Sequence, residues 1–217
     1  MIIEVPQDII DRLDDRLKTM PERAPEVLRK TINDTAKSAR REVARQAQDQ
    51  YAVKAGAFNK AMKIENATQR YLQATIHTEG RPLPLYGFKA RKNMGMTAAK
   101  AKVLSQGSLK ELILKNGDSN GKDLKAFVTK AGKHVGIFQR MNPDEKRKQQ
   151  SYFDSLAKGE KGKKTTKRNA IKQLYSVSIP QMAGSEKRVY SQVHPVIMEE
   201  LHRRLEEHIA EVMEGMR

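Results

Sequence analysis

The chain has 217 residues, enough for one domain with additions or for two small domains. Hydrophobic residues make up 38% and Trp is absent, which limits the size of the core. The sequence has no Cys, which excludes disulfides, thiolate metal sites and cysteine nucleophiles. No apolar run approaches the roughly 20 residues of a membrane span, and no signal peptide is visible at the N-terminus, so we expect no membrane partner.

The net charge of +16 is concentrated in one section of the chain. Residues 81–170 contain 22 Lys/Arg against 7 Asp/Glu, a net charge of +15. Residues 1–80 hold 14 against 12, and residues 171–217 hold 6 against 7. Such a block indicates a surface for a polyanion, with nucleic acid as the first candidate. A set of solvated loops is the plainer alternative.

The N-terminal third shows helical periodicity. Ile9, Leu13, Leu17 and Met20 predict a short amphipathic helix that begins near Pro6 and ends at Pro21. A longer helix is predicted from about residue 25 to residue 50, followed by a short helix over 54–62. The long helix carries a narrow, Ala-rich stripe that a sheet or a second helix can approach closely. The stripe consists of Leu28, Ile32, Ala36, Ala39, Val43 and Ala47, and Arg40, Arg41 and Arg45 lie on the opposite face.

The periodicity then changes to that of strands. Residues 71–77 alternate, with Leu72, Ala74 and Ile76 on one face. The two prolines in 80–88 exclude a helix or a central strand there. Weaker strands are predicted at 100–104 and 111–115. A hairpin is predicted from 124–129 and 135–140 around a turn that contains Gly132.

The last third begins with a Lys-rich section, 141–169, whose composition predicts a mobile basic insertion. A strand over 171–176 and a turn over 179–184 follow. The C-terminal helix is predicted over 185–216, and Pro195 either kinks it or marks its start. Its apolar stripe is Val189, Val193, Ile197, Leu201, Leu205, Ile209 and Val212.

Together these elements predict an α+β fold in a single domain, 1–217. The helical N-terminal part is 1–62, the mainly antiparallel sheet comprises 63–140 and 170–182, and the C-terminal helix completes it. No nucleophile elbow, Walker loop or dinucleotide-binding loop is present, so we expect neither an enzyme nor a cofactor. His202 and Glu206, one helical turn apart, are the best metal-ligating pair, but such residues are common on an amphipathic surface helix, so we expect no metal site.

Several segments resemble the prophage minor tail protein Z family of lambda-like tailed phages, whose members act in tail completion. The resemblance runs in order from about residue 24 to residue 217, and its most distinctive segments are 28–40, 51–56, 81–85, 126–128, 136–140 and 179–182. It implies a structural virion protein at the head-proximal end of a long non-contractile tail, made in the host cytoplasm. The implied partners are a tail terminator, a head–tail connector and further copies in a ring.

Two sets of residues are the candidate contacts. The first would face a polyanion or the DNA end: Lys158, Lys161, Lys163, Lys164, Lys167 and Arg168. The second would face a subunit or partner: Arg81, Pro82, Leu83, Pro84, Leu85, Arg40, Arg41, Glu199 and Glu206. The alternative function is a nucleic-acid-binding module without sequence preference that uses the basic section 81–170. The absence of a helix-turn-helix or zinc knuckle weakens that alternative.

Overall fold

The structure is a computed structural model that describes residues 1–3, 6–18, 20–53, 56–90, 98–117, 120–131, 133–148 and 171–214. The contacts form two compact units. The first, here called the helical unit, comprises Met1–Arg81 and Val177–Arg217; the second, the basic unit, comprises Pro82–Ser176. Helices and antiparallel strands both contribute, which confirms the α+β class. That the two units fold as one domain stays a prediction.

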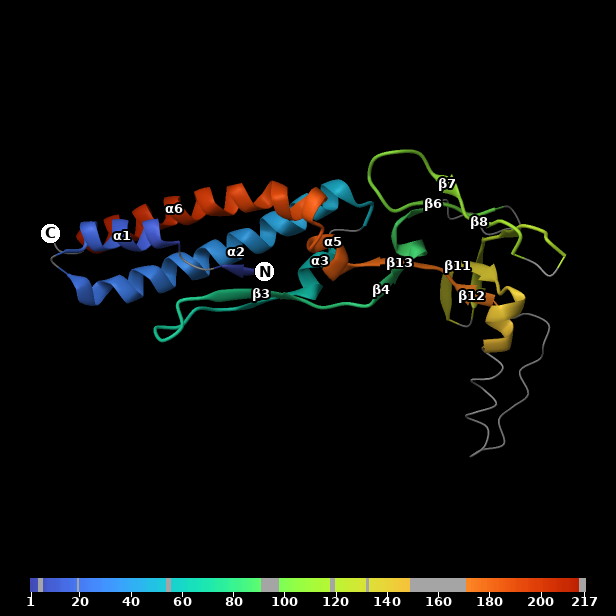
Figure 1. Cartoon of the computed structure of the whole chain (residues 1–217), viewed down its shortest axis with the longest axis horizontal. Coiled ribbons are helices and arrows are strands. Elements are labelled where there is room, and N and C mark those ends of the chain that lie inside the picture. Colours follow the sequence, from blue (N-terminus) through green and yellow to red (C-terminus); the bar gives the residue numbers. More distant parts are fainter. Residues whose placement is uncertain are drawn as a thin grey trace, which may run out of the picture. The chain divides into compact units, whose positions relative to one another are not determined.

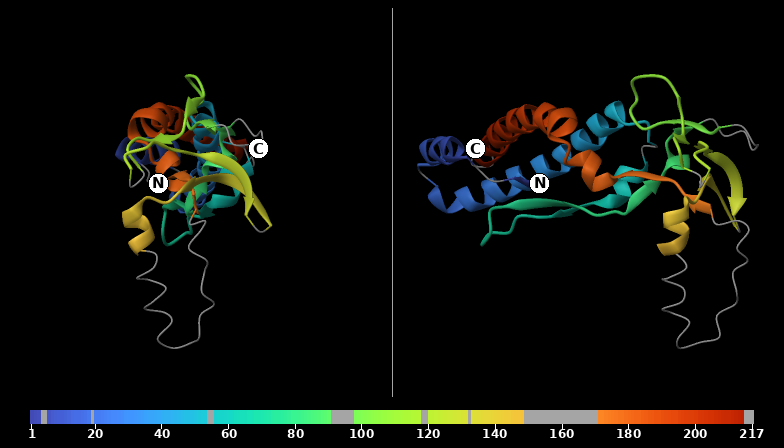
Figure 2. Two further views of the ribbon diagram at one scale, coloured as in Figure 1. Left: turned by 90° about the vertical axis from the view of Figure 1, so that its right-hand side faces the viewer. Right: turned by 45° about the vertical axis from the view of Figure 1, so that its right-hand side comes forward.

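Three helices dominate the helical unit. Helix α1 spans Gln7–Arg16, a short 3-10 turn η1 spans Pro21–Arg23, and α2 spans Ala24–Gln50. Helix α2 runs between α6 (Ser191–Glu214) on one side and strands β2 (Met62–Glu65) and β3 (Ala74–Thr78) on the other (Figures 1 and 2). Its predicted stripe is buried from Leu28 to Ala47, because Ala side chains allow both neighbours to approach closely.

The stripes of α1 and α6 meet at one end of this unit. Their apolar side chains form a single cluster with the start of α2, made of Ile9, Leu13, Leu17, Met20, Val27, Leu28, Leu201, Leu205 and Ile209. Each of these side chains is less than 10% exposed. Their burial supplies the main apolar stabilisation between the three helices.

Helix α6 begins through an irregular turn. A π-helical turn, η3, spans Glu186–Tyr190, where the N–H groups of Val189 and Tyr190 both donate to the carbonyl oxygen of Ser185 at 2.9 and 3.0 Å. Pro195 lies inside α6, just beyond its first turn. Proline has no N–H to donate, so the usual bond to the carbonyl oxygen of Ser191, four residues earlier, is missing at this position.

A small antiparallel sheet covers the other side of α2. It contains β1 (Ile2–Ile3), β3 (Ala74–Thr78) and β2 (Met62–Glu65) in that order, and α3 (Gly56–Ala61) leads into β2. Ala74 and Ile76 of β3 are buried, as the alternating pattern predicts. Asn33 of α2 holds the β2–β3 connection through Ala67.

One prediction in this unit is wrong. The section 179–184, predicted as a turn, contains helix α5 (Ile179–Ala183). Ser178 caps it: the Ser178 Oγ accepts from the Gln181 N–H, and the Gln181 side chain accepts from the Ser178 N–H at 3.0 Å. Pro180 lies in the first turn, where its missing N–H costs nothing. The Ser-x-x-Gln capping box was the signal that the presence of proline obscured.

The basic unit is built from short antiparallel strands. One sheet has the order β5 (Lys89–Ala90), β6 (Lys100–Lys102), β7 (Lys110–Glu111), and a strand pair joins β8 (Ile113–Leu114) to β9 (Leu124–Lys125). A third sheet has the order β10 (Phe127–Ala131), β11 (His134–Arg140), β12 (Ile171–Gln173). Strand β4 (Pro82–Pro84) pairs with β13 (Tyr175–Ser178) and continues into a 3-10 turn, η2 (Leu85–Gly87).

The predicted hairpin exists with shifted bounds. Strands β10 and β11 pair from Phe127–Phe138 to Ala131–His134, so the loop is tighter than predicted. Residues 124–125 form β9 with a different partner, because Ala126 interrupts the strand with bonds to two other segments. Gly136 in β11 lies beneath the ring of Phe138, and a Cβ there would come within 3.0 Å of that ring.

The predicted mobile insertion, 141–169, begins with a helix: residues 143–148 are helical. Asn142 caps it, since its Oδ1 accepts from the Glu145 N–H at 2.7 Å while the Asn142 N–H donates to the Glu145 carboxylate at 3.0 Å. The sequence Asn-Pro-Asp-Glu is a capping box with proline in the first turn, a signal that the charge-based prediction overlooked. The rest of the predicted insertion, 149–169, lies outside the described residues.

Candidate interaction surfaces

The residues predicted to contact a polyanion, Lys158 to Arg168, lie outside the described residues. The proline segment is described, and its two ends differ. Arg81 and Pro82 are exposed, whereas Leu85 is buried and its N–H donates to the carbonyl oxygen of Leu174 at 2.9 Å. The segment is therefore extended and anchored at Leu85 within the basic unit, and its contact with a partner stays a prediction.

The predicted interface residues on the helices have different environments. Arg40 donates to the Asn59 carbonyl oxygen at 3.2 Å and Arg41 donates to Ser38 Oγ at 3.3 Å. Glu206 pairs with Arg12 and Arg16 of α1 at 3.7 and 3.2 Å, so this carboxylate fastens α1 to α6. Glu199 is exposed and has no partner among the described residues. Of the predicted acidic contacts, Glu199 is the one left available to a neighbour.

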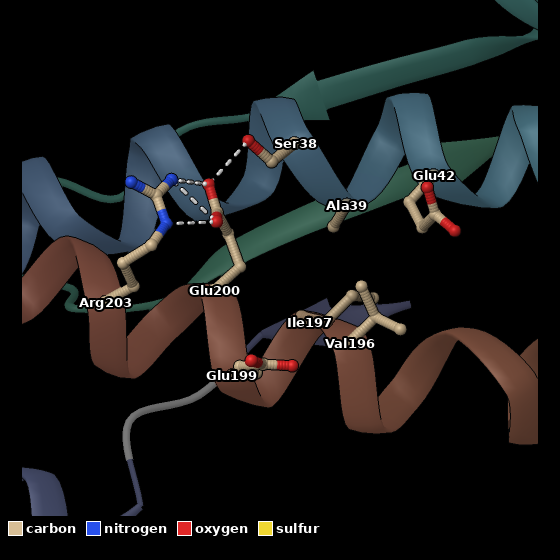
Figure 3. A pocket seen from close by; sticks show the side chains of 8 residues that line it. All are labelled: Ser38, Ala39, Glu42, Val196, Ile197, Glu199, Glu200 and Arg203. Carbon is tan, nitrogen blue, oxygen red and sulfur yellow. Dashed lines mark hydrogen bonds and ion pairs between the residues drawn. The ribbon is translucent and has the colours of Figure 1, made fainter.

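A groove of about 300 Å³ lies between α2 and α6, next to Glu199. Its floor is apolar: Ala39 and Ile197 are buried, and Val196 is 46% exposed at the opening. Ser38, Glu42, Glu200 and Arg203 complete the lining, and Figure 3 shows Glu200 reaching from α6 toward Ser38 on α2. The groove exists because Ala39 is too small to fill the space opposite Val196.

The carboxylates of the groove are held by arginines. The Glu200 carboxylate accepts from Ser38 at 3.2 Å and from Arg203 and Arg204. Burial would raise the pKa of Glu200, but these hydrogen bonds together lower it below its ordinary value of 4.5. Bonds from Arg45 lower the pKa of Glu42, against a smaller opposing effect of burial. Both groups stay ionised at neutral pH, so the groove offers a contact surface and no proton acceptor of raised pKa.

Sequence reasoning missed a buried histidine further along the same helix pair. His208 is 7% exposed; its Nε2 lies 3.3 Å from Asp34 of α2 and its Nδ1 lies 3.3 Å from Glu211. His208 Nε2 is buried and forms no hydrogen bond with Asp34 at this distance. Burial would raise the pKa of Asp34, but the bond from Lys37 and the charges of Lys37, His208 and Arg204 together lower it. Only the packing of α2 on α6 brings these groups together.

His202 and Glu206, the pair considered as metal ligands, each face residues of α1. His202 Nε2 lies 3.7 Å from Asp8 and Glu206 faces Arg12 and Arg16. Within the described ranges, no group of three His, Asp or Glu side chains is arranged so that it could hold a metal ion. Among the same residues, no helix is both long and apolar enough to cross a bilayer.

The basic unit leaves most of its described cations unpaired. Lys100 pairs with Glu111 at 3.2 Å, Arg147 pairs with Asp144 at 3.0 Å, and Lys172 pairs with Glu145. The side chains of seven others form no ion pair or hydrogen bond within the described part of the chain: Lys89, Lys110, Lys115, Lys122, Lys125, Lys130 and Arg140.

Comparison of the chain with known protein families, with curated protein sequences and with solved structures finds no match.

Proposed function

We propose that this chain is a structural protein of a tailed-bacteriophage virion that completes the head-proximal end of the tail and enables head–tail joining. The observation that carries the proposal is the division of charge between the two units. The helical unit has 20 Lys/Arg against 19 Asp/Glu, whereas the basic unit has 22 against 7. A nearly neutral unit suits packing among protein neighbours, and a strongly basic unit suits an anionic partner.

The resemblance to the minor tail protein Z family supplies the setting. Its helical segment 28–40 lies in α2, its segment 136–140 lies in β11, and α6 corresponds to the C-terminal helix of the pattern. In this setting the partners are a tail terminator, a head–tail connector and further copies in a ring. The open groove beside Glu199 gives the helical unit a surface for one of them.

A second candidate is a nucleic-acid-binding module without sequence preference. The unpaired lysines of the basic unit favour it, because neutralising phosphates releases counterions and needs no specific geometry. This candidate predicts binding to DNA without any role in the virion.

Disruption of the gene in the phage that carries it tests the proposal. Electron microscopy should then show filled heads and separate tails of normal length. Joined, infectious particles in normal yield would overturn the virion role and leave the nucleic-acid-binding module as the better account. Tails of abnormal length would place the protein in tube assembly and also contradict completion.

A further inference from the structure

The strand register gathers lysines on one face of the β5–β6–β7 sheet. Lys89 lies directly opposite Lys102, and Lys100 lies directly opposite Glu111. Residues directly opposite each other share a face, as do alternate residues of one strand. Lys89, Lys100, Lys102 and Glu111 therefore share one face, here called the lysine face. Ala101 points to the other face, together with Ala90 and Lys110, and is 4% exposed, whereas Lys89 on the lysine face is exposed.

The charges on this face do not cancel. Two like charges directly opposite each other destabilise a strand pair, and Lys89 and Lys102 are such a pair. Lys102 Nζ donates to the carbonyl oxygens of Ser105 and Gly107 at 2.5 and 3.1 Å, which satisfies its hydrogen bonds but leaves its charge. Glu111 is the one carboxylate on this face and pairs with Lys100. A sequence that keeps such a local conflict commonly does so for function.

The type of cation indicates the class of partner. The basic unit uses 18 Lys and 4 Arg, whereas the helical unit uses 7 Lys and 13 Arg. In the helical unit arginines bind carboxylates with defined geometry, as Arg45 does with two bonds to Glu42. Protein–protein interfaces are enriched in Arg and depleted in Lys. A lysine-rich surface suits phosphates that are contacted as point charges.

We propose that the lysine face binds the phosphate backbone of duplex DNA. The inference rests on the proposed function, in which the basic unit faces a polyanion, and it selects nucleic acid over an acidic protein neighbour. Lys89 is free for a phosphate, and Lys100 is shared between Glu111 and the ligand. Because the contacts are electrostatic, binding is independent of base sequence and weakens steeply with salt.

The test is a salt titration of binding by the full chain to a mixed-sequence DNA duplex, with three single substitutions. Lys89→Gln should lower the log–log salt slope by about 0.9, which corresponds to roughly fivefold weaker binding at 0.15 M salt. Glu111→Gln removes the one carboxylate and frees Lys100, so it should strengthen binding by a similar factor. Lys60→Gln, an exposed lysine of the helical unit without a described partner, is the charge-matched control and should change binding less than twofold.

The opposite signs expected for Lys89→Gln and Glu111→Gln exclude misfolding as the explanation. If Lys89→Gln and Lys60→Gln weaken DNA binding equally and Glu111→Gln does not strengthen it, the lysine face is not the DNA-binding surface. Polyglutamate that displaces the DNA at equal charge concentration would also overturn it, in favour of an acidic protein partner. Absence of any DNA binding by the unmodified chain would overturn the inference, while the gene-disruption result would still decide the virion role separately.

Discussion

Asn33 and Ala67 are joined by two hydrogen bonds that run in opposite directions. Asn33 Nδ2 donates to the Ala67 carbonyl oxygen at 3.2 Å, and the Ala67 N–H donates to Asn33 Oδ1 at 2.7 Å. Ala67 is 4% exposed, so its backbone groups depend on this partner. One side chain on α2 thus fixes the connection between β2 and β3.

Replacement of the Asn33 side chain should weaken the attachment of the β1–β3–β2 sheet to α2. We expect Asn33→Ala to lower the free energy of unfolding by about 1–3 kcal/mol, because it leaves a buried N–H and a buried carbonyl unpaired. Urea unfolding of the full chain measures the change. Asn59→Ala, at an exposed position on α3, is the control and should stay within about 0.5 kcal/mol of the unmodified chain. Equal stability of the two variants would mean that water replaces Asn33 at no cost.

The Glu200 cluster predicts a pH-dependent contribution to stability. Because the folded-state pKa of Glu200 lies below its ordinary value of 4.5, the ionised carboxylate stabilises the fold above pH 4.5. That contribution is lost as the pH falls below 4.5 through the folded-state pKa. Glu200→Gln should therefore cost about 1 kcal/mol at pH 7, and the difference from the unmodified chain should shrink toward pH 3. If Glu200→Gln lowers the free energy of unfolding by the same amount at pH 7 and at pH 3, the lowered pKa of Glu200 is contradicted.

Gly136 is predicted to be required by the packing of Phe138. A Cβ at position 136 would meet the Phe138 ring and the Gln173 amide, each at 3.0 Å. The amide end can move aside, but the buried ring cannot, so Gly136→Ala should destabilise the chain by about 1–3 kcal/mol. Gly87→Ala, where nothing lies within 4 Å of the added Cβ, is the matched control in the same unit. If Gly87→Ala lowers the thermal unfolding temperature more than Gly136→Ala does, then β11 shifts to accept the methyl group.

The cap at Asn142 should hold the start of the helix over 143–148. We expect Asn142→Ala to cost about 1 kcal/mol, while Asn142→Ser, which keeps a capping oxygen, should cost less than half as much. Hydrogen exchange of the amide of Glu145, which donates to Asn142 Oδ1, reports the cap locally. Unchanged protection of that amide in Asn142→Ala would show that the cap does not limit local opening.

Local patterns were sufficient to predict the helices. The spacing of Leu28, Ile32 and Ala39 placed α2 with its buried face, because amphipathic periodicity is a property of neighbouring residues. Capping boxes are equally local: Ser178-x-x-Gln181 and Asn142-x-x-Glu145 each mark a helix start, although proline and charge density alone predict a turn and a mobile segment there.

The candidate surfaces depend on contacts that sequence spacing does not encode. The groove requires Ala39 of α2 to face Val196 and Ile197 of α6, and the buried His208 requires Asp34 at the same interface. The lysine face requires the pairing of Lys89 with Lys102 across an intervening segment. Each juxtaposition is set by helix packing or strand register, which depend on the whole unit.

Rescue of head–tail joining by the purified chain tests the proposed role in tail completion. Tails from a phage with the gene disrupted are mixed with filled heads, with and without the protein, and infectious particles are counted. Infectious particles should form in proportion to the added chain, and heads and tails without it should remain separate. Joining at the same yield without the chain, or failure of the folded chain to restore it, would contradict the proposed role in tail completion.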